Sequence, residues 1–323
     1  MIVSPALADA NNGNWRTARR WQQMLEAAFD VRITSTWPDA ASPRDDVMLA
    51  LHARRSAAAC QAWAEVHPGR GLGVVLTGTD LYQDLATSVD AQRSVQLAQR
   101  LVVLQERAPD ALAPELRRKA QVIYQSTPST PPVVKTDAML RVAMVGHLRA
   151  VKSPQTLFEA AHLLAGRPDI RIDHIGDASQ EPVLAAAARA TMADCPGYRW
   201  LGGVPHLETL AHIRDAHVLV HTSMMEGGAH VILEAVQAGT PVIASAVDGN
   251  VGMLGADYGG YFPAGDAAAL ADMLQLCRDT QQDPAGSLLA RLVAQCRLRA
   301  PLFEPASEEA ALIGLVHSLL NPS

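Results

Sequence analysis

The hydrophobic positions of this chain form short apolar runs that alternate with longer stretches of helical spacing. Residues 71–77 are apolar on both faces, which is typical of a central strand in a parallel sheet. Amphipathic stretches such as 15–29 and 56–66 lie between such runs, and strands that alternate with helices indicate βαβ units. In the first part of the chain the pattern predicts strands over residues 1–6, 30–35, 46–52, 71–77, 100–106 and 120–125.

A second series of the same kind follows residue 140. Residues 153–166 are expected to form a helix, with Ser153 as N-cap, Pro154 in the first turn and Gly166 beyond its end. Residues 307–320 also have helical spacing, and we expect this last helix, within residues 306–323, to cross back to the first domain. The other elements predicted here are strands 140–146, 170–176, 198–203, 217–223 and 240–245, and helices 180–193, 206–215, 229–238, 266–282 and 285–298.

A proline-rich segment separates the two series. Residues 126–138, STPSTPPVVKTDA, cannot continue a helix or a central strand, because proline lacks a backbone N–H. We therefore expect a linker there, between a first domain over residues 1–133 and a second over residues 139–305. The predicted fold class is α/β, with two Rossmann-like, doubly wound domains facing across a cleft and ligands at the carboxyl ends of the strands.

Composition and charge narrow the functions that such a fold can carry. The chain has 323 residues and a formal net charge of −6, which argues against a dedicated nucleic-acid binder. We find no signal peptide and no apolar stretch long enough to cross a membrane, so a cytoplasmic protein without a membrane partner is expected. The four cysteines form no C-x-x-C pair and are expected to be reduced and mostly buried.

The strongest local pattern is HTSMMEGGAHVILEAVQAGTPVIAS, residues 221–245, which predicts a strand, a glycine loop, a helix, a turn and another strand. Small residues open that helix, and exposed backbone N–H groups at a helix N-terminus attract phosphate. Glu234 lies about two turns into the helix, where its carboxylate can accept hydrogen bonds from two ribose hydroxyls. Glu226, in the loop, would face the sugar end of the same ligand. His221 is expected to be a core histidine without a chemical role.

A second segment suited to anions follows the first predicted strand. Its turn-rich loop ends in Asn14, which can cap the next helix, and Arg16 is the arginine nearest to that loop. Of Arg19 and Arg20, at least one is expected on a solvated face. Asp80 follows the strand over 71–77 and either faces the cleft or caps a helix. The residues expected to bind an acceptor are Asn12, Gly13, Asn14, Arg16, Thr77, Gly78, Thr79 and Asp80.

These patterns together resemble the donor-binding signature of retaining GT-B glycosyltransferases of the sucrose-synthase and glycogen-synthase-like group. One part of the resemblance is E-x7-E followed by A-x-x-x-G-x-P-V-I-A-S. Three upstream segments are also similar to family motifs: GHLRAVKSP at 146–154, HIGDAS at 174–179 and WLGGVP at 200–205. The resemblance covers roughly residues 140–300 and implies a GT-B fold and a UDP-sugar donor.

The resemblance also implies roles for single residues. Lys152 falls on the family lysine that grips the donor diphosphate, whereas His147 replaces the family arginine and Arg149 follows two residues later. The implied catalytic residues are Lys152, Arg149 and Glu226. The residues implied to bind the donor, through phosphate, nucleotide or uracil contacts, are Gly146, His147, Gly176, Gly203, Val204, Gly227, Gly228, Ala229, His230 and Glu234.

Over essentially its whole length the chain resembles a narrower family, the selenosugar synthases of selenoneine biosynthesis. The segments that carry this resemblance are PALADANNGNWRTARRW, LTGTDLYQDL, VGHLRAVKSP and MMEGGAHVILEAVQAGTPVIAS. It implies transfer of a hexosamine from UDP-N-acetylglucosamine, or a related UDP-hexose, to selenophosphate. Because selenophosphate is already ionised, the reaction needs positioning and charge neutralisation more than a general base. No D-x-D pair follows a strand, so we expect a metal-independent enzyme with no cofactor.

Two other functions stay open at this point. A GT-B glycosyltransferase with a sugar, thiol or lipid acceptor would share the donor site, and the Trp and Arg residues of helix 15–29 would suit a lipid. A non-catalytic protein could bind a UDP-sugar without turnover, although Lys152, Glu226 and Glu234 weigh against this. A nicotinamide oxidoreductase is disfavoured, because no G-x-G-x-x-G follows the first strand. The stereochemistry at the anomeric carbon is open.

Overall fold

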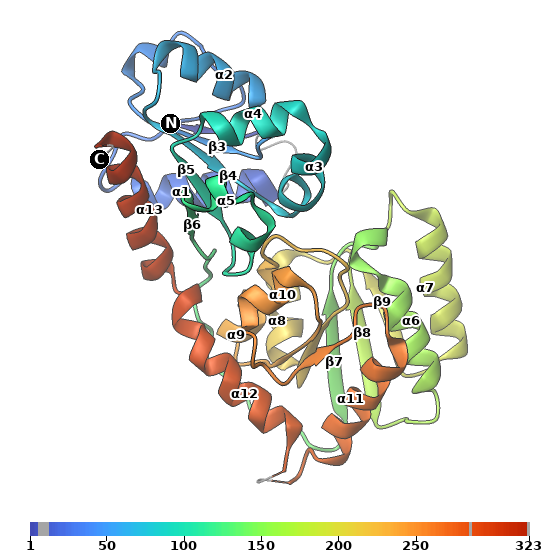
Figure 1. Cartoon of the computed structure of the whole chain (residues 1–323). Helices are drawn as coiled ribbons and strands as arrows, with labels where there is room; N and C mark the ends of the chain where they lie inside the picture. The colour runs from blue at the N-terminus through green and yellow to red at the C-terminus, as the bar shows by residue number, and fades with distance from the viewer. Residues whose placement is uncertain (6–12, 284–285, 322–323) are drawn as a thin grey trace. The chain divides into compact units, whose positions relative to one another are not determined.

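The computed structural model describes residues 1–5, 13–283 and 286–321. It divides into two compact units, each traced by the colour ramp of Figure 1: unit 1 is Met1–Gln125 with Pro305–Ser323, and unit 2 is Ser126–Glu304. The first boundary falls before the proline-rich segment and not at residue 133, so residues 126–138 go with unit 2. The C-terminal residues return to unit 1.

Unit 1 is built around a parallel sheet. Its elements are β1 (Ile2–Val3), β2 (Ile33–Thr34), β3 (Met48–Leu51), β4 (Leu72–Val75), β5 (Arg100–Val103), β6 (Ala120–Val122), α1 (Gly13–Leu25), α2 (Ala57–Val66), α3 (Leu85–Thr87), α4 (Val89–Leu97), α5 (Pro114–Arg117) and α13 (Pro305–Leu320). The strand order is β2-β1-β3-β4-β5-β6, and it reverses at β1. In Figure 1, α2 and α4 lie on one face of this sheet and α1 and α13 on the other.

Each face of this sheet carries its own hydrophobic cluster. Trp63 of α2 is fully buried among residues of α4 and the sheet, and Trp21 of α1 is fully buried against α13 and the other face. Full burial of a large apolar side chain stabilises the fold by about 1.5–3 kcal/mol relative to exposure. The C-terminal helix therefore contributes to one of the two hydrophobic clusters of unit 1.

One buried carboxylate fixes that helix to α1. The side chain of Glu308 in α13 is 0% exposed and accepts hydrogen bonds from Nε and Nη2 of Arg20, both at 3.0 Å, and from Nε1 of Trp21 at 2.6 Å. A buried charge is tolerated only when it is paired and hydrogen-bonded. Arg20 therefore has a structural role. Arg19, by contrast, is exposed, and its side chain donates a hydrogen bond to Gln22 one turn along the same helix.

Unit 2 has a second parallel sheet, with strand order β12-β11-β10-β7-β8-β9. Its elements are β7 (Leu140–Val145), β8 (Ile170–Ile175), β9 (Tyr198–Gly202), β10 (Val218–His221), β11 (Val242–Ser245), β12 (Tyr261–Phe262), α6 (Pro154–Leu163), α7 (Pro182–Asp194), α8 (His206–Asp215), α9 (His230–Gln237), α10 (Asp248–Leu254), α11 (Ala267–Asp279) and α12 (Leu288–Arg299). Helices cover both faces of the sheet (Figure 1). The order reverses between β7 and β10, as in dinucleotide-binding folds, and this reversal marks a ligand crevice.

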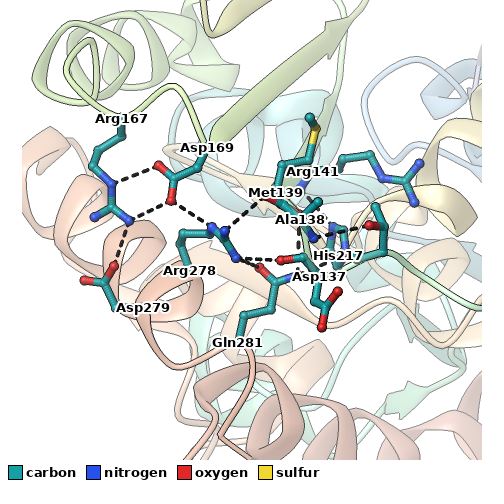
Figure 2. A network of polar contacts seen from close by, with 11 residues as sticks. Asp137, Ala138, Met139, Arg141, Arg167, Asp169, His217, Arg278, Asp279 and Gln281 are labelled. Atoms are coloured by element: carbon teal, nitrogen blue, oxygen red, sulfur yellow. Dashed lines mark hydrogen bonds and ion pairs between the residues drawn. The ribbon is translucent and has the colours of Figure 1, made fainter.

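The proline-rich segment is hydrogen-bonded to the rest of unit 2 near its C-terminal end. Figure 2 shows Arg278 of α11 donating to the carbonyls of Asp137 and Ala138 at 2.9 and 3.0 Å, while its Nε lies 2.8 Å from Asp169. Nearby, Nε2 of His217 is 2.6 Å from the carbonyl of Thr136. These bonds occupy backbone groups that a segment without helix or strand would otherwise leave to water.

The loops that follow β7, β8 and β9 are joined by backbone hydrogen bonds. Gly146 donates to Ile175 at 2.9 Å, Leu148 donates to Asp177 at 2.9 Å, and Gly176 donates to Gly202 at 2.8 Å. The approach is so close that a Cβ on Gly176 would lie 1.8 Å from the carbonyl oxygen of Gly146. Gly176 is thus required by the protein's own backbone at the edge formed by the carboxyl ends of the strands.

The predicted fold class, two doubly wound α/β domains, is confirmed by the two parallel sheets. The hydrophobic pattern missed short elements, among them α4, α10 and β12. All four cysteines are free and buried. No helix among the described residues is long and apolar enough to cross a membrane.

Glu308→Ala is expected to destabilise unit 1 by about 3 kcal/mol, because it leaves Arg20 and Trp21 without their shared buried acceptor. Glu309→Ala, the adjacent half-exposed glutamate of α13, is the matched control and should change stability by no more than about 0.5 kcal/mol. Urea unfolding, with amide exchange of α1 and α13 peptides, measures both. Equal effects of the two changes would contradict the role assigned to Glu308.

Gly176→Ala is expected to destabilise unit 2 by about 2 kcal/mol or more, because the backbone of Gly146 must move to admit the methyl group. The control is Gly146→Ala, where the added Cβ would meet nothing closer than 3.9 Å. Thermal unfolding of the two variants should differ clearly. A Gly176→Ala protein as stable as Gly146→Ala would show that this edge of the sheet yields freely.

Candidate active site

The candidate donor residues of unit 2 gather at the reversal point between β7 and β10. The segment after β7 includes η5 (Ala150–Lys152), a single tight helical turn, and the segment after β10 begins at Thr222. The two segments are joined, because Thr222 Oγ1 donates to the carbonyl of Lys152 at 2.7 Å and the Met224 N–H donates to the carbonyl of Val151 at 2.8 Å. Lys152 and the glycine loop therefore belong to one assembled edge.

A left-handed residue ends the turn that carries Lys152. Ser153 has φ +46°, a conformation that is rare and costly for a residue other than glycine and that often occurs at functional sites. Ser153 is the N-cap residue of α6, as predicted, but its hydroxyl lies 2.9 Å from Oγ1 of Thr156 and makes no capping bond to the backbone. The sharp turn lets the Lys152 side chain reach across to the loop after β10.

Glu226 is the charged centre of this edge. Its Oε1 accepts a short hydrogen bond from Nζ of Lys152, and Nε2 of His221 lies 3.1 Å from the same oxygen. The side chains of Glu226, His221 and Lys152 are 11%, 2% and 28% exposed. Burial raises the pKa of Glu226, but the charge of Lys152 and the hydrogen bond from His221 outweigh it and hold the pKa below its usual range.

The backbone of Glu226 is enclosed by α10. A Cβ on Gly249 would lie 2.1 Å from the carbonyl oxygen of Glu226, so only glycine fits there. Asn250 donates through Nδ2 to the carbonyl of Ser245 at 2.9 Å, and Ser245 Oγ donates to the carbonyl of Ser223 at 2.5 Å. This buried network fixes the start of the loop that presents Glu226.

The helix after the glycine loop begins later than predicted. Gly227, Gly228 and Ala229 do not open it: α9 starts at His230, with Ala229 as N-cap and no side-chain capping bond. The first N–H groups of α9 therefore depend on partners other than a cap, and a phosphate is one such partner.

Glu234 is a second buried carboxylate, with a 6% exposed side chain, and it lies in α9 between two histidines. Nε2 of His206 in α8 and Nε2 of His230 are each 3.5 Å from its Oε1. Within the described ranges, no group of three or more His, Cys, Asp or Glu side chains is placed to hold a metal ion.

Other predicted donor residues lie at the neighbouring strand ends. His147 is exposed, and its Nδ1 accepts a hydrogen bond from the Asp177 N–H at 3.2 Å, which ties the loop after β7 to the end of β8. Gly203 is exposed and Val204 is half-buried just after β9. Arg149 is exposed and lies before η5, outside the Lys152–Glu226–His221 cluster.

In unit 1 the predicted acceptor segment is only partly described. Asn12 lies outside the described residues. The described part of α1 covers Gly13–Leu25, so Asn14 lies within the helix and is not the N-cap that its sequence predicts. Arg16 is exposed in the first turn of α1. This arrangement leaves Arg16 as the acceptor candidate whose position fits an anion best.

Asp80 does not fit direct contact with an acceptor. Its side chain is 0% exposed, and it accepts hydrogen bonds from the N–H of Ala53 at 2.9 Å, the N–H of Thr77 at 2.6 Å and the hydroxyl of Thr77 at 2.7 Å. It therefore joins the loop after β3 to the loop after β4 and positions the turn that holds half-buried Thr77 and Gly78 and exposed Thr79.

Sequence reasoning missed His221 and His206. His221 was expected to be an inert core histidine, yet it contacts Glu226. The available signal was a polar residue at the end of an otherwise apolar strand, five positions before a loop carboxylate. Residue His206 gave no such signal, because it meets Glu234 only through the packing of α8 beside α9.

Comparison with known proteins relates part of unit 2 to a known family. Residues 133–284 match the model of the family described as glycosyl transferases group 1. A D-inositol 3-phosphate glycosyltransferase of Streptomyces avermitilis is 34% identical over 179 residues, which are 52% of this chain and 37% of that protein's length.

Solved structures show the same fold at low sequence identity. Anabaena Alr3699/HepE, in complex with UDP and glucose, gives a TM-score of 0.69 at 16% identity over 92% of this chain and 89% of that one. Sucrose-phosphate synthase from Thermosynechococcus elongatus gives 0.66 at 22% identity over 86% and 74%. The chain therefore has the GT-B fold, and its residues 133–284 are similar to the domain of glycosyl transferases group 1.

Proposed function

We propose that this protein is a glycosyltransferase that takes a hexosamine from a UDP-sugar and transfers it to selenophosphate. The observation that carries the donor half is the edge at the reversal point of unit 2, where Lys152 and the uncapped start of α9 lie beside two buried carboxylates. A nucleotide sugar has the matching pattern, with two phosphates between two polyhydroxylated rings. HepE, which shares the fold, is described in complexes with UDP and with UDP-glucose.

Each group of this edge has a proposed task. Lys152 and the first N–H groups of α9 neutralise the diphosphate, which gains charge as the bond to the sugar breaks. Glu234 accepts hydrogen bonds from the ribose hydroxyls, and Glu226 accepts them from the sugar. Because these groups supply the positive charge, we propose a metal-independent reaction.

The acceptor proposal rests on the resemblance of the chain to selenosugar synthases and on Arg16 at the start of α1. In the proposed step, a selenium lone pair of selenophosphate attacks the anomeric carbon, and the carbon–oxygen bond to UDP breaks with its electron pair. The products are UDP and a seleno sugar whose selenium still bears the phosphoryl group. Water then cleaves the phosphorus–selenium bond, releasing phosphate and the 1-seleno sugar.

The first test is incubation of the purified protein with UDP-N-acetylglucosamine and fresh selenophosphate, anaerobically and with a chelator present. We expect UDP and a hexosamine with the selenium isotope pattern in the mass spectrum, formed only when both substrates are present. UDP-sugar binding without this product would remove selenophosphate and direct the search to sugar, thiol or lipid acceptors. A requirement for added divalent metal would contradict the metal-independent mechanism.

Separate donor and acceptor sites predict separate kinetic effects. Glu234→Ala should weaken UDP binding about 30-fold, because hydrogen bonds to a charged group contribute about 1.5–3 kcal/mol. Arg16→Ala should raise the acceptor KM about tenfold or more and leave the UDP Kd nearly unchanged. Arg19→Ala, on the same helix, is the control for Arg16. Calorimetry gives the UDP Kd and initial rates give KM; equal losses of UDP affinity in Glu234→Ala and Arg16→Ala would overturn this division.

A further inference from the structure

His221 is a buried histidine that the proposed chemistry has not yet used. We propose that it is a positioning residue, which keeps Glu226 ionised and aimed at the sugar when Lys152 turns from Glu226 to the donor diphosphate. The assignment rests on the proposed function, since it needs a UDP-sugar in the site. In this proposal Lys152 and Glu226 contact the donor, whereas His221 acts on the donor only through Glu226.

The position of His221 leaves its ring little freedom. It is the last residue of β10, a strand paired with β7 on one side and β11 on the other, and its backbone is in register with Ala244. Its side chain is 2% exposed. Lys152, by contrast, is 28% exposed at the end of a flexible side chain. Of the two partners of Glu226, the lysine is free to change partner and the histidine is not.

Both partners use the same oxygen of Glu226. Nζ of Lys152 and Nε2 of His221 meet at Oε1, and every hydrogen bond of this carboxylate within the described structure ends at that oxygen, which leaves Oε2 for another donor. If Lys152 were the sole partner, donor binding would strip a nearly buried carboxylate of its hydrogen bond, which is strongly unfavourable. With His221 in place, Oε1 keeps a donor and Oε2 stays available for a sugar hydroxyl.

The charge of Glu226 follows the same logic. Burial raises its pKa, and Lys152 and His221 together bring the pKa below its usual range. When Lys152 moves to the diphosphate, the hydrogen bond from His221 is the interaction that still opposes burial. A protonated Glu226 would have one fewer lone pair to offer and would meet the developing positive charge of the sugar without an anion.

Two amide variants separate the two ring nitrogens. The side-chain nitrogen of glutamine reaches the place of Nε2, whereas that of asparagine reaches only the place of Nδ1. We expect His221→Asn to lower kcat about 30-fold while the UDP Kd changes by less than about threefold, because the defect lies in positioning and not in binding. His221→Gln should recover kcat to within about fivefold of the wild type.

The pH dependence of kcat gives a readout that a purely structural role would not move. Loss of the His221 hydrogen bond removes an interaction that lowers the pKa of Glu226, so that pKa rises. The carboxylate is needed as an anion. With a raised pKa it becomes protonated earlier during acidification, so the variant loses activity at a higher pH than the wild type. The acid limb of the profile should shift upward in His221→Asn and much less in His221→Gln.

His217→Asn is the matched control for loss of a buried histidine. His217 precedes the other end of β10, accepts a hydrogen bond from the Arg141 N–H at 2.9 Å and bonds Thr136, far along the strand from Glu226. Its replacement should lower Tm as much as His221→Asn or more, with kcat little changed. A kcat loss in His221→Asn that merely follows Tm, or an equal loss in His221→Gln, would overturn the assignment.

Wild-type measurements separate this inference from the function on which it rests. Failure of the wild type to bind UDP or UDP-N-acetylglucosamine would overturn the proposed function, and the role of His221 with it. If the donor binds but selenophosphate is not used, the same variants are compared by release of UDP through hydrolysis with water. If His221→Asn releases UDP as fast as the wild type, the role of His221 is overturned while the proposed function stands.

Discussion

The candidate site depends on keeping one nearly buried carboxylate charged at the point where the strand order of unit 2 reverses. Glu226 can stay ionised there only because Lys152 reaches it from the turn after β7 and His221 reaches it from the end of β10. Those two partners arrive correctly only because the segments after the strands are bonded to each other through Thr222 and Met224. The network around α10 in turn holds the backbone of Glu226. The charge of Glu226 therefore depends on the conformation of these loops, and the loops depend in turn on the strand order of the sheet.

Close backbone approach is the second feature on which the site depends. Gly176 and Gly249 each occupy a place where a Cβ would overlap a carbonyl oxygen, of Gly146 and of Glu226 respectively. Tight packing of this kind transmits small displacements, because a close-packed interior has few voids to absorb them. Gly176 and Gly249 therefore serve the protein's own geometry.

Much of the fold could be predicted from the sequence because its signal is local and periodic. Apolar runs and amphipathic stretches alternate along the chain, and a parallel sheet with helices on both faces is the arrangement that buries both. Glu226, Glu234 and Lys152 could be found for a similar reason, since each lies in a segment with a characteristic pattern. The exact start of α9 could not, because Gly227–Ala229 offer no Ser, Thr, Asp or Asn side chain to mark the N-cap. The position of Asn14 was missed in the same way.

The partners of the charged residues were beyond the sequence for a different reason. His206 meets Glu234, Glu308 meets Arg20 and Gly249 meets Glu226 across packed elements, and no periodicity encodes such contacts. The place of Asp80 after a strand predicts either contact with an acceptor or a helix cap, whereas its burial and three hydrogen bonds make it a support for that loop. The segment 126–138 was expected to be a linker from its prolines, whereas its carbonyls are held by Arg278 and His217.

The shared oxygen of Glu226 also bears on how tightly a donor can bind. Lys152 is bonded to Glu226, so the diphosphate of the proposed donor would have to draw the lysine away from a favourable partner before it gains its charge. That competition lowers affinity by the free energy of the lysine–carboxylate contact. In the role proposed for His221 this loss is smaller, because the carboxylate keeps a hydrogen bond after the lysine leaves. The protein has a net charge of −6, so it offers no general attraction for an anion. A lysine that already lies beside the proposed diphosphate site, and that can leave its carboxylate at a small free-energy cost, supplies the positive charge locally.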